Sequence, residues 1–311
     1  MNEIGRVLLS TGSWCEVLLE NGIIISCRVK GKMRIKGLDT TNPVAVGDRV
    51  RIELELNADT ASIIDVLPRN NYIIRRSPHH RKQSHILAAN LDIALLVVTI
   101  KSPRTSFGFT DRFLVNASMY HIPVLILLNK MDLLDENEKE MARLWEDIYK
   151  PLGYQVLKIS ALNRADIEKV RTAIKGNTIL LAGHSGTGKS TLLNSISPEL
   201  KLKTANLSGY SGKGMHTTTF ARMIILENET FVIDTPGIKE FDILDIEPAE
   251  VGHYFPEIQA KMDQCKFANC LHENEQLCAV KKAVEEGSIA ASRYDSYISI
   301  LLTRKNDYHW K

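Results

Sequence analysis

Residues 183–190 read Gly183-His184-Ser185-Gly186-Thr187-Gly188-Lys189-Ser190, which fits the phosphate-loop pattern of Gly, any four residues and then Gly-Lys-Ser/Thr. A strand pattern, Thr178–Ala182, precedes the motif and a helical pattern, Lys189–Ile196, follows it, as the motif requires. Glycines let the backbone curl until its N–H groups converge on phosphate oxygens, and the helix N-terminus attracts negative charge. We therefore expect Lys189 to reach the β- and γ-phosphates of a nucleotide and Ser190 to ligate Mg²⁺.

A second phosphate-site motif, Asp234-Thr235-Pro236-Gly237, follows the apolar strand pattern Thr230–Ile233. An acidic residue at the end of such a strand is the usual partner of Mg²⁺ in phosphate-loop enzymes. Gly237 allows a backbone N–H to approach the γ-phosphate. We therefore assign Asp234 and Gly237 to the same site as the phosphate loop.

Two further motifs predict that the base is guanine. Asn129-Lys130-Met131-Asp132 follows the strand pattern Ile122–Leu128 and matches the Asn-Lys-x-Asp signature. The Asp132 carboxylate can accept hydrogen bonds from guanine N1–H and the exocyclic amine, whereas adenine would leave it unpaired, so the motif selects GTP over ATP. We expect Asn129 to contact the base edge and hold neighbouring loops, with the Lys130 stem over the base. Ser160-Ala161-Leu162 matches the second base loop, whose backbone N–H meets guanine O6.

The order of these segments is unusual. The base loops precede the phosphate loop, whereas in ordinary GTPases the phosphate loop comes first. Moving the termini to a surface loop leaves strand neighbours intact, so the order predicts a circularly permuted GTPase. The residues expected to bind the nucleotide are Asn129, Lys130, Met131, Asp132, Ser160, Ala161, Gly183, His184, Ser185, Gly186, Thr187, Gly188, Lys189, Ser190, Thr191, Asp234 and Gly237.

Strand and helix patterns alternate from Leu91 onward, which predicts an α/β fold with a mostly parallel, doubly wound sheet. The apolar strand patterns are Ile93–Ile100, Ile122–Leu128, Gln155–Ile159, Thr178–Ala182, Arg222–Leu226 and Thr230–Ile233. The helical patterns are Asp111–Tyr120, Glu136–Tyr149, Asp166–Ile174 and Lys189–Ile196, with two more near Ala279–Glu286 and Ile289–Thr303.

The first seventy or so residues predict a small all-β unit, with an OB-like barrel as the commonest fold of that size. Its short apolar runs are Gly5–Leu9, Cys15–Leu19, Ile23–Ile35, Val50–Leu56 and Ala61–Leu67. In the third run, the period of two places five cations on one face, namely Arg28, Lys30, Lys32, Arg34 and Lys36. This face is either a solvated outer surface or a surface that contacts nucleic-acid phosphates.

Residues 71–90 are polar and basic, with the run Arg75-Arg76-Ser77-Pro78-His79-His80-Arg81-Lys82-Gln83-Ser84-His85 and no acidic side chain in it. We expect a solvated linker there, with an RNA-contacting loop as the alternative. Its adjacent histidines have no ligand partner at a convincing spacing, so we predict no metal site in this segment.

Cys265-x4-Cys270-x-His272-x5-Cys278 places three thiols and an imidazole within fourteen residues. Three thiolates and one imidazole suit tetrahedral Zn²⁺ and leave no ligand position open, so we expect one structural zinc ion. The other two of the five cysteines lie in strand-like surroundings, which favours a reducing compartment over a disulfide framework.

The composition is that of an ordinary globular protein, with 44% apolar and 24% charged residues and a formal net charge of +2. It excludes a disordered tail protein, a collagen and a coiled-coil rod. The longest apolar runs fall far short of the ~20 residues that span a bilayer, and no signal peptide is visible. We therefore expect no membrane partner.

Taken together, the chain resembles the RsgA family (ribosome small-subunit-dependent GTPase A) over nearly its whole length. Besides the motifs above, the resemblance includes Val46-Gly47-Asp48, Ala89-Asn90-Leu91-Asp92 and the switch run His216-Thr217-Thr218-Thr219. It implies a cytoplasmic assembly factor that binds the immature small (30S) ribosomal subunit and its rRNA, and whose slow hydrolysis of GTP to GDP is stimulated by that subunit. We expect this factor to be a monomer. We expect three domains: an RNA-binding barrel over 1–72, the permuted GTPase domain over 73–243 and a zinc-binding helical domain over 244–311.

The group that orients the attacking water is not obvious. Ras-like GTPases use a Gln after Asp-x-x-Gly, but here Ile238 follows Gly237, and an apolar side chain cannot polarise water. His216, a backbone group or the ribosomal partner remain alternatives, and His216 is the tentative catalytic residue. Either Thr218 or Thr219 is expected to ligate Mg²⁺ when GTP is bound.

Two other classes of protein stay open. A non-enzymatic RNA-binding protein would have a degenerate nucleotide site, but Lys189, Ser190, Asp234 and Asp132 are all present. A phosphate-loop ATPase or kinase would lack the guanine signature. The motifs therefore favour a GTPase over both.

Overall fold

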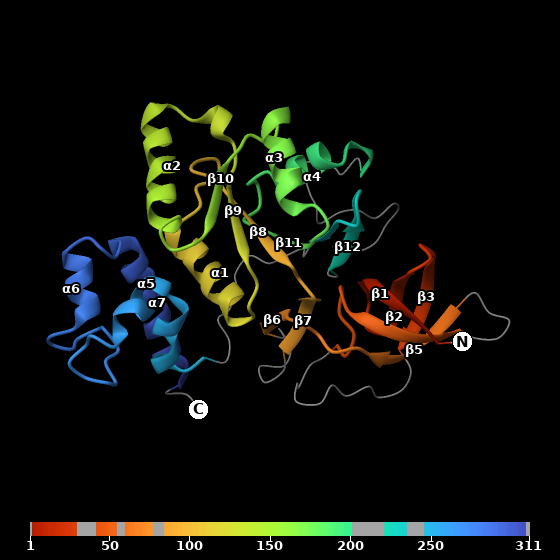
Figure 1. Ribbon diagram of the computed structural model, residues 1–311, viewed down its shortest axis with the longest axis horizontal. Coiled ribbons are helices and arrows are strands. Elements are labelled where there is room, and N and C mark those ends of the chain that lie inside the picture. Colours follow the sequence, from red (N-terminus) through yellow and green to blue (C-terminus); the bar gives the residue numbers. More distant parts are fainter. Residues whose placement is uncertain are drawn as a thin grey trace.

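The computed structural model describes residues 2–29, 42–54, 60–76, 84–200, 221–234 and 246–308. A β-barrel and a helical module lie at opposite ends of a central α/β domain (Figure 1). Within the described residues, no helix combines the length and apolar character needed to cross a membrane.

The N-terminal barrel has five strands, β1 (Asn2–Ser10), β2 (Trp14–Leu19), β3 (Ile24–Val29), β4 (Arg49–Leu54) and β5 (Thr60–Val66). They close in the order β1-β2-β3-β5-β4 and back to β1, antiparallel except for the parallel pair β3–β5. Inward side chains such as Val17, Cys27 and Ile52 are fully or almost fully buried, because alternate residues of each strand face the interior. The expected five-stranded barrel is confirmed.

The central sheet contains β8 (Ile93–Val98), β9 (Val124–Leu128), β10 (Gln155–Lys158), β11 (Thr178–Ala182), β12 (Arg222–Ile225) and β13 (Phe231–Asp234). Its order is β10-β9-β8-β11-β13-β12, and all neighbours are parallel except β12. Helices cover both faces, which explains why its strands read as continuous apolar runs rather than as alternating ones.

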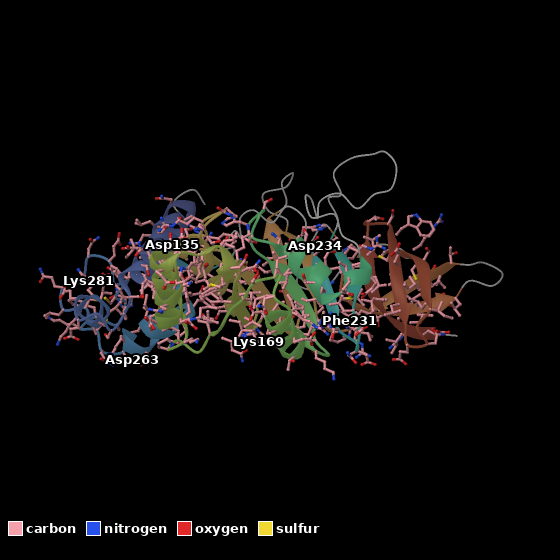
Figure 2. The ribbon with its side chains drawn as sticks, turned by 90° about the horizontal axis from the view of Figure 1, so that it is seen from above. Asp135, Lys169, Phe231, Asp234, Asp263 and Lys281 are labelled. Atoms are coloured by element: carbon pink, nitrogen blue, oxygen red, sulfur yellow. The ribbon has the colours of Figure 1, made fainter. Side chains whose placement is uncertain are left out.

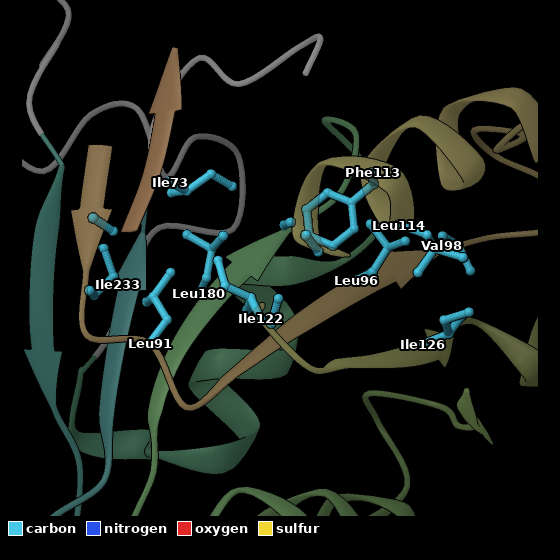
Figure 3. Packing of buried hydrophobic residues seen from close by; sticks show 14 of the residues in the cluster. Ile73, Leu91, Leu96, Val98, Phe113, Leu114, Ile122, Ile126, Leu180 and Ile233 are labelled. Atoms are coloured by element: carbon cyan, nitrogen blue, oxygen red, sulfur yellow. The ribbon is translucent and has the colours of Figure 1, made fainter. Parts of the chain in front are cut away.

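Helices α1 (Phe107–Met119) and α2 (Glu136–Tyr149) pack on one face of this sheet, and α3 (Arg164–Ile174) and α4 (Lys189–Ile196) pack on the other. Figure 3 shows Phe113 and Leu114 of α1 against Leu96 and Val98 of β8. The helix starts follow from side-chain caps: Ser106, Asp135 and Asn163 each accept a backbone N–H of the first turn.

The expectation of a solvated linker over 71–90 is wrong at both of its ends. β6 (Tyr72–Arg76) and β7 (Ser84–Ala89) pair antiparallel and form a separate two-stranded sheet. The charged residues hid two short apolar runs: Ile73 and Ala88 are buried in the core that includes α1, and Ile74 and Ile86 belong to a second, smaller cluster. Residues 77–83 lie outside the described part of the chain.

The barrel is joined to the central sheet by direct contacts. Leu9 of β1 pairs with Arg222 of β12, so the two sheets are continuous. Arg6 donates a hydrogen bond of 3.0 Å to Thr178 Oγ1 and lies 4.4 Å from the centre of the Phe231 ring.

The motif at residues 46–48 contacts the motif at residues 89–92. Gly47 has φ +89°, and a Cβ at this position would lie 2.1 Å from Ala89 O. The two motifs therefore form the junction between the barrel and the central sheet.

The C-terminal module consists of a 3₁₀ helix η4 (Pro248–Tyr254), α5 (Pro256–Met262), α6 (Ala279–Glu285) and α7 (Ala291–Tyr308). The sequence predicted the last two but not η4 and α5, which are short and begin with proline. Val115 of α1 belongs to the same core as these helices, so the module packs directly on the central α/β domain.

Candidate nucleotide-binding and metal-binding sites

The phosphate loop joins the end of β11 to the start of α4, in the centre of the sheet. Gly183 has φ +137°, and a Cβ at this position would lie 2.2 Å from Val97 O of the neighbouring strand. Gly188 has φ +98°, and a Cβ there would lie 2.4 Å from Asn129 Nδ2. A side chain at either position would therefore collide with a neighbouring group, and both residues have a positive φ, which favours glycine.

Lys189 folds back over the loop, where Nζ donates hydrogen bonds of 2.6 and 2.7 Å to the carbonyl oxygens of Gly183 and His184. Burial lowers the pKa of Lys189, and the nearby Asp234 carboxylate opposes that shift. Asp234 ends β13, directly beside Leu181 of β11, and is buried. Figure 2 shows Asp234 and Asp135 toward one edge of the molecule and Phe231 toward the other, so the acidic group lies at the carboxyl edge of the sheet.

Asn129 connects three of the predicted segments. It follows β9 and is 2% exposed. Its Nδ2 donates to Thr187 O of the phosphate loop at 2.8 Å, and its Oδ1 accepts from Ala161 N–H of the second base loop at 3.0 Å. Ser195 of α4 reaches the same base loop and donates to Ala161 O at 2.7 Å. One amide therefore holds the phosphate loop and both base loops in register.

Asp132 has a different environment. It lies in the 3₁₀ turn η1 (Met131–Leu133), is exposed, and makes no hydrogen bond or ion pair with the residues that the structure describes. Lys130 precedes it with φ +65° and donates from Nζ to Ser102 O. The carboxylate is thus available for a ligand, while the Lys130 ammonium group is held by the Ser102 carbonyl.

The remaining predicted residues fall around the same loop. Thr187 is fully buried, Ser185 and Gly186 are exposed, and Ser190 and Thr191 are half-buried in the first turn of α4. Ser160 is buried, and its N–H donates to Asp166 Oδ2 at 3.0 Å. The described members of the set therefore converge on one edge of the sheet.

Several predictions concern residues outside the described part of the chain. They are the catalytic candidate His216, the two magnesium candidates Thr218 and Thr219, the glycine Gly237, and four of the five barrel cations, Lys30, Lys32, Arg34 and Lys36. Arg28, the fifth cation, is exposed on β3 with its guanidinium 4.6 Å from the centre of the Trp14 ring.

The structure adds residues that the motifs did not reveal. The loop after β8 places Ser102 at Lys130 and Pro103 beside Gly186. Phe109 of α1 stacks on His184 of the phosphate loop, with ring centres 3.8 Å apart. No local sequence signal marks these contacts, because each joins segments that are distant in the chain.

The four predicted metal ligands come together in the C-terminal module. The donor atoms of Cys265, Cys270, His272 and Cys278 all lie within 4.8 Å of one another. His272 Nδ1 is 3.5 Å from Cys265 Sγ and 3.4 Å from Cys278 Sγ, and those two sulfurs are 3.9 Å apart. Bonds of about 2.0–2.3 Å to a tetrahedral ion give donor separations close to these values.

The backbone around these residues is held by neighbouring side chains. Tyr294 and Tyr297 of α7 donate to the carbonyl oxygens of His272 and Leu271, each at 2.6 Å. Glu275 accepts the N–H groups of Leu271, Glu273 and Asn274. The His272 ring is buried, with Nδ1 toward the thiols. The Cys3His cluster is therefore built to hold a metal ion.

Known proteins match nearly the whole chain. The RsgA GTPase family model matches residues 66–244 and the RsgA N-terminal domain model matches residues 4–64. The small ribosomal subunit biogenesis GTPase RsgA of Bacteroides fragilis is 51% identical over 297 residues, 96% of each chain. Its counterpart from Christiangramia forsetii is 46% identical over 306 residues, which are 98% of this chain and 97% of the relative.

Two solved structures have the same fold. The crystal structure of YjeQ from Thermotoga maritima aligns with a TM-score of 0.79 at 36% identity, over 98% of this chain and 99% of that one. The structure of YloQ, described as a circularly permuted GTPase, aligns with a TM-score of 0.75 at 30% identity, over 99% and 96% of the two chains.

The base loops precede the phosphate loop along the chain, yet all of them meet at one edge of the sheet. This arrangement defines a circularly permuted phosphate-loop GTPase, an enzyme that hydrolyses GTP. The family matches narrow that class further: the chain belongs to the RsgA family.

Proposed function

We propose that this GTPase acts in the late maturation of the small (30S) ribosomal subunit, binding the subunit and its rRNA and hydrolysing GTP to GDP and phosphate faster when bound to it. The observation that carries the proposal is the Asn129 bridge, which holds the phosphate loop and both base loops together. It occurs in a chain about half identical to proteins named small ribosomal subunit biogenesis GTPases.

In the proposed site, Asp132 selects guanine and the phosphate-loop N–H groups bind the phosphates. Ala161 N–H is already bonded to Asn129 Oδ1, so guanine O6 would share this donor with the amide. Lys189 would leave the two loop carbonyls and turn to the β- and γ-phosphates, because a phosphate is a stronger acceptor for a cation than a carbonyl.

Magnesium fits the donor set at Ser190 and Asp234, which are hard oxygen groups at one edge of the sheet. Bound there with GTP, and with Thr218 or Thr219, the ion would neutralise charge on the β- and γ-phosphates. His216 stays our proposed water-orienting residue, since Ile238 cannot serve. Turnover that depends on the subunit is consistent with the absence of the glutamine that orients the attacking water in Ras-like GTPases.

Zinc is the metal we propose for the Cys3His cluster. Thiolate and imidazole donors at tetrahedral spacing suit Zn²⁺, and four protein ligands leave no open position for catalysis. The ion would therefore stabilise the C-terminal module rather than take part in the reaction.

The barrel is proposed to contact rRNA phosphates through Arg28, Lys30, Lys32, Arg34 and Lys36. We further propose that the enzyme acts as a cytoplasmic monomer with domains over 1–72, 73–243 and 244–311. The junction of Gly47 with Ala89 is consistent with the first boundary, because it lies where barrel and GTPase sheet meet.

The deciding experiment measures GTP hydrolysis by the purified protein with and without small ribosomal subunits, with the large subunit as control. We expect a low basal rate and a clear stimulation by the small subunit alone. Equal rates in all three conditions would contradict the ribosomal role, and efficient competition by ATP would contradict the guanine assignment.

A further inference from the structure

A buried ion cluster joins the C-terminal module to α1 of the GTPase domain. Arg293 of α7 is 1% exposed and pairs with Asp111 of α1 at 2.6 Å, and its Nε pairs with Glu257 of α5, also at 2.6 Å. Tyr149 of α2 donates to the same Asp111 oxygen at 2.7 Å. Breaking a pair of this kind leaves an uncompensated buried charge, so the cluster fixes α7 and α1 relative to each other.

The same α7 holds the metal loop. Tyr294 and Tyr297 follow Arg293 within about one helical turn, and their hydroxyls donate to the carbonyl oxygens of His272 and Leu271. The backbone of a metal ligand and the buried cluster are therefore anchored on one rigid segment.

Helix α1, which is held by the buried ion cluster, also contacts the phosphate loop. Phe109 lies on α1 only two residues before Asp111, and its ring stacks on His184 at 3.8 Å with an angle of 32° between the rings. Ser106 caps this first turn of α1 by accepting the Phe109 N–H at 3.2 Å. The loop just before it supplies the carbonyl of Ser102 to Lys130 of the guanine motif.

We propose that α1 sets the position of the phosphate loop from the metal-binding module, with Phe109 as a positioning residue that acts through His184. The inference rests on the proposed nucleotide site and adds a role for residues that no motif includes. Because His184 lies within the loop that would bind the phosphates, a shift of α1 changes the geometry of that loop, and GDP affinity should report it.

The first arm of the test compares three variants of the full-length, metal-loaded protein by calorimetric titration with GDP in the presence of Mg²⁺. Phe109→Leu removes the aromatic stack, Phe109→Tyr keeps it, and Phe107→Leu is the matched control. Phe107 stacks on Trp145 of α2 instead, with ring centres 4.8 Å apart. An aromatic pair contributes about 0.5–1.5 kcal/mol, so Phe109→Leu should weaken GDP binding about two- to tenfold.

A spectroscopic readout separates positioning from general destabilisation. The His184 ring protons should show a ring-current shift in the wild-type protein that is lost in Phe109→Leu and kept in Phe109→Tyr, with His184→Gln used for assignment. Unchanged GDP affinity and unchanged His184 signals in Phe109→Leu, while the wild type binds GDP, would overturn this inference alone. A wild-type protein that does not bind GDP would overturn the proposed site as well.

The second arm tests the connection to the module. Arg293→Lys keeps the charge but loses the planar fork that reaches both Asp111 and Glu257, and Tyr149→Phe is a milder change at the same carboxylate. Each should weaken GDP binding in the wild-type background and have little effect when combined with Phe109→Leu. Simple additivity of the folded variants, or no effect of either single change, would overturn the coupling.

Discussion

Replacing Asn129 with Ala should destabilise the protein even without nucleotide, although Asn129 belongs to the guanine motif. Its amide is 2% exposed and makes two hydrogen bonds inside the protein, to Thr187 O and from Ala161 N–H. The substitution removes both partners at once. The carbonyl of Thr187 and the N–H of Ala161 then lose their bonds in a region where Thr187 is fully buried.

The magnitude follows from the cost of unpaired groups. A buried donor or acceptor left unsatisfied costs about 1–3 kcal/mol. For two groups, with partial relief by water at the open loop, we expect a loss of about 2–4 kcal/mol in the free energy of unfolding. At a urea dependence of about 2–3 kcal/mol per molar, the unfolding midpoint should fall by roughly 1 M.

The assay should follow the GTPase domain alone, because a chain of three domains need not unfold in one step. Trp145 of α2 is 2% exposed and serves as the reporter once Trp14 and Trp310 are changed to Phe. Asp132→Asn is the matched control from the same motif. Asp132 is exposed and makes no hydrogen bond or ion pair with the described residues, so this variant should change stability by less than about 0.5 kcal/mol.

The two variants should also differ in nucleotide binding. Asp132→Asn should weaken GTP binding and increase preference for xanthosine triphosphate, because an amide complements the additional xanthine carbonyl. Asn129→Ala should weaken the binding of GTP and of xanthosine triphosphate without changing the preference between them. Equal unfolding midpoints for Asn129→Ala and Asp132→Asn would refute the argument that Asn129 acts chiefly as a bridge between loops.

Three further outcomes follow from the site and the two flanking domains. Lys189→Ala should lower turnover by orders of magnitude while the far-ultraviolet circular dichroism stays unchanged; wild-type hydrolysis after removal of contaminating GTPases would show that the loop is misassigned. Cys270→Ser should remove the bound metal, as measured by elemental analysis, and unfold the C-terminal module. The affinity for GDP should fall no further than it does in Phe109→Leu. Wild-type protein that is purified without stoichiometric zinc would contradict the zinc proposal. Changing Lys30, Lys32 and Arg34 together to Glu should abolish salt-sensitive binding to the small subunit and its stimulation of turnover, leaving the basal rate intact; normal stimulation would move the rRNA contact to another surface.

Local patterns were sufficient to predict the elements that carry the nucleotide site. Strand β11 and helix α4 have the bounds that their apolar periods indicate, because a central strand and the helix after a phosphate loop are defined by residues next to one another. The hairpin of β6 and β7 was missed for the opposite reason. Its charged residues dominate the local pattern, and only the tertiary packing reveals that Ile73 and Ile86 are buried in two neighbouring hydrophobic clusters.

The chemistry of this protein can be inferred from its motifs, namely the phosphate loop, the guanine motif, the Cys3His ligand set and the permuted order of these parts. The contacts that join these parts become visible only in the folded chain. Asn129 meets a loop 58 residues away, and Arg293 meets an aspartate 182 residues away. The physical reason is that the residues of a motif are neighbours in the sequence, so their spacing alone indicates which groups a short loop can present to a ligand. Contacts between distant segments depend on how sheets and helices pack, and no local pattern carries that information.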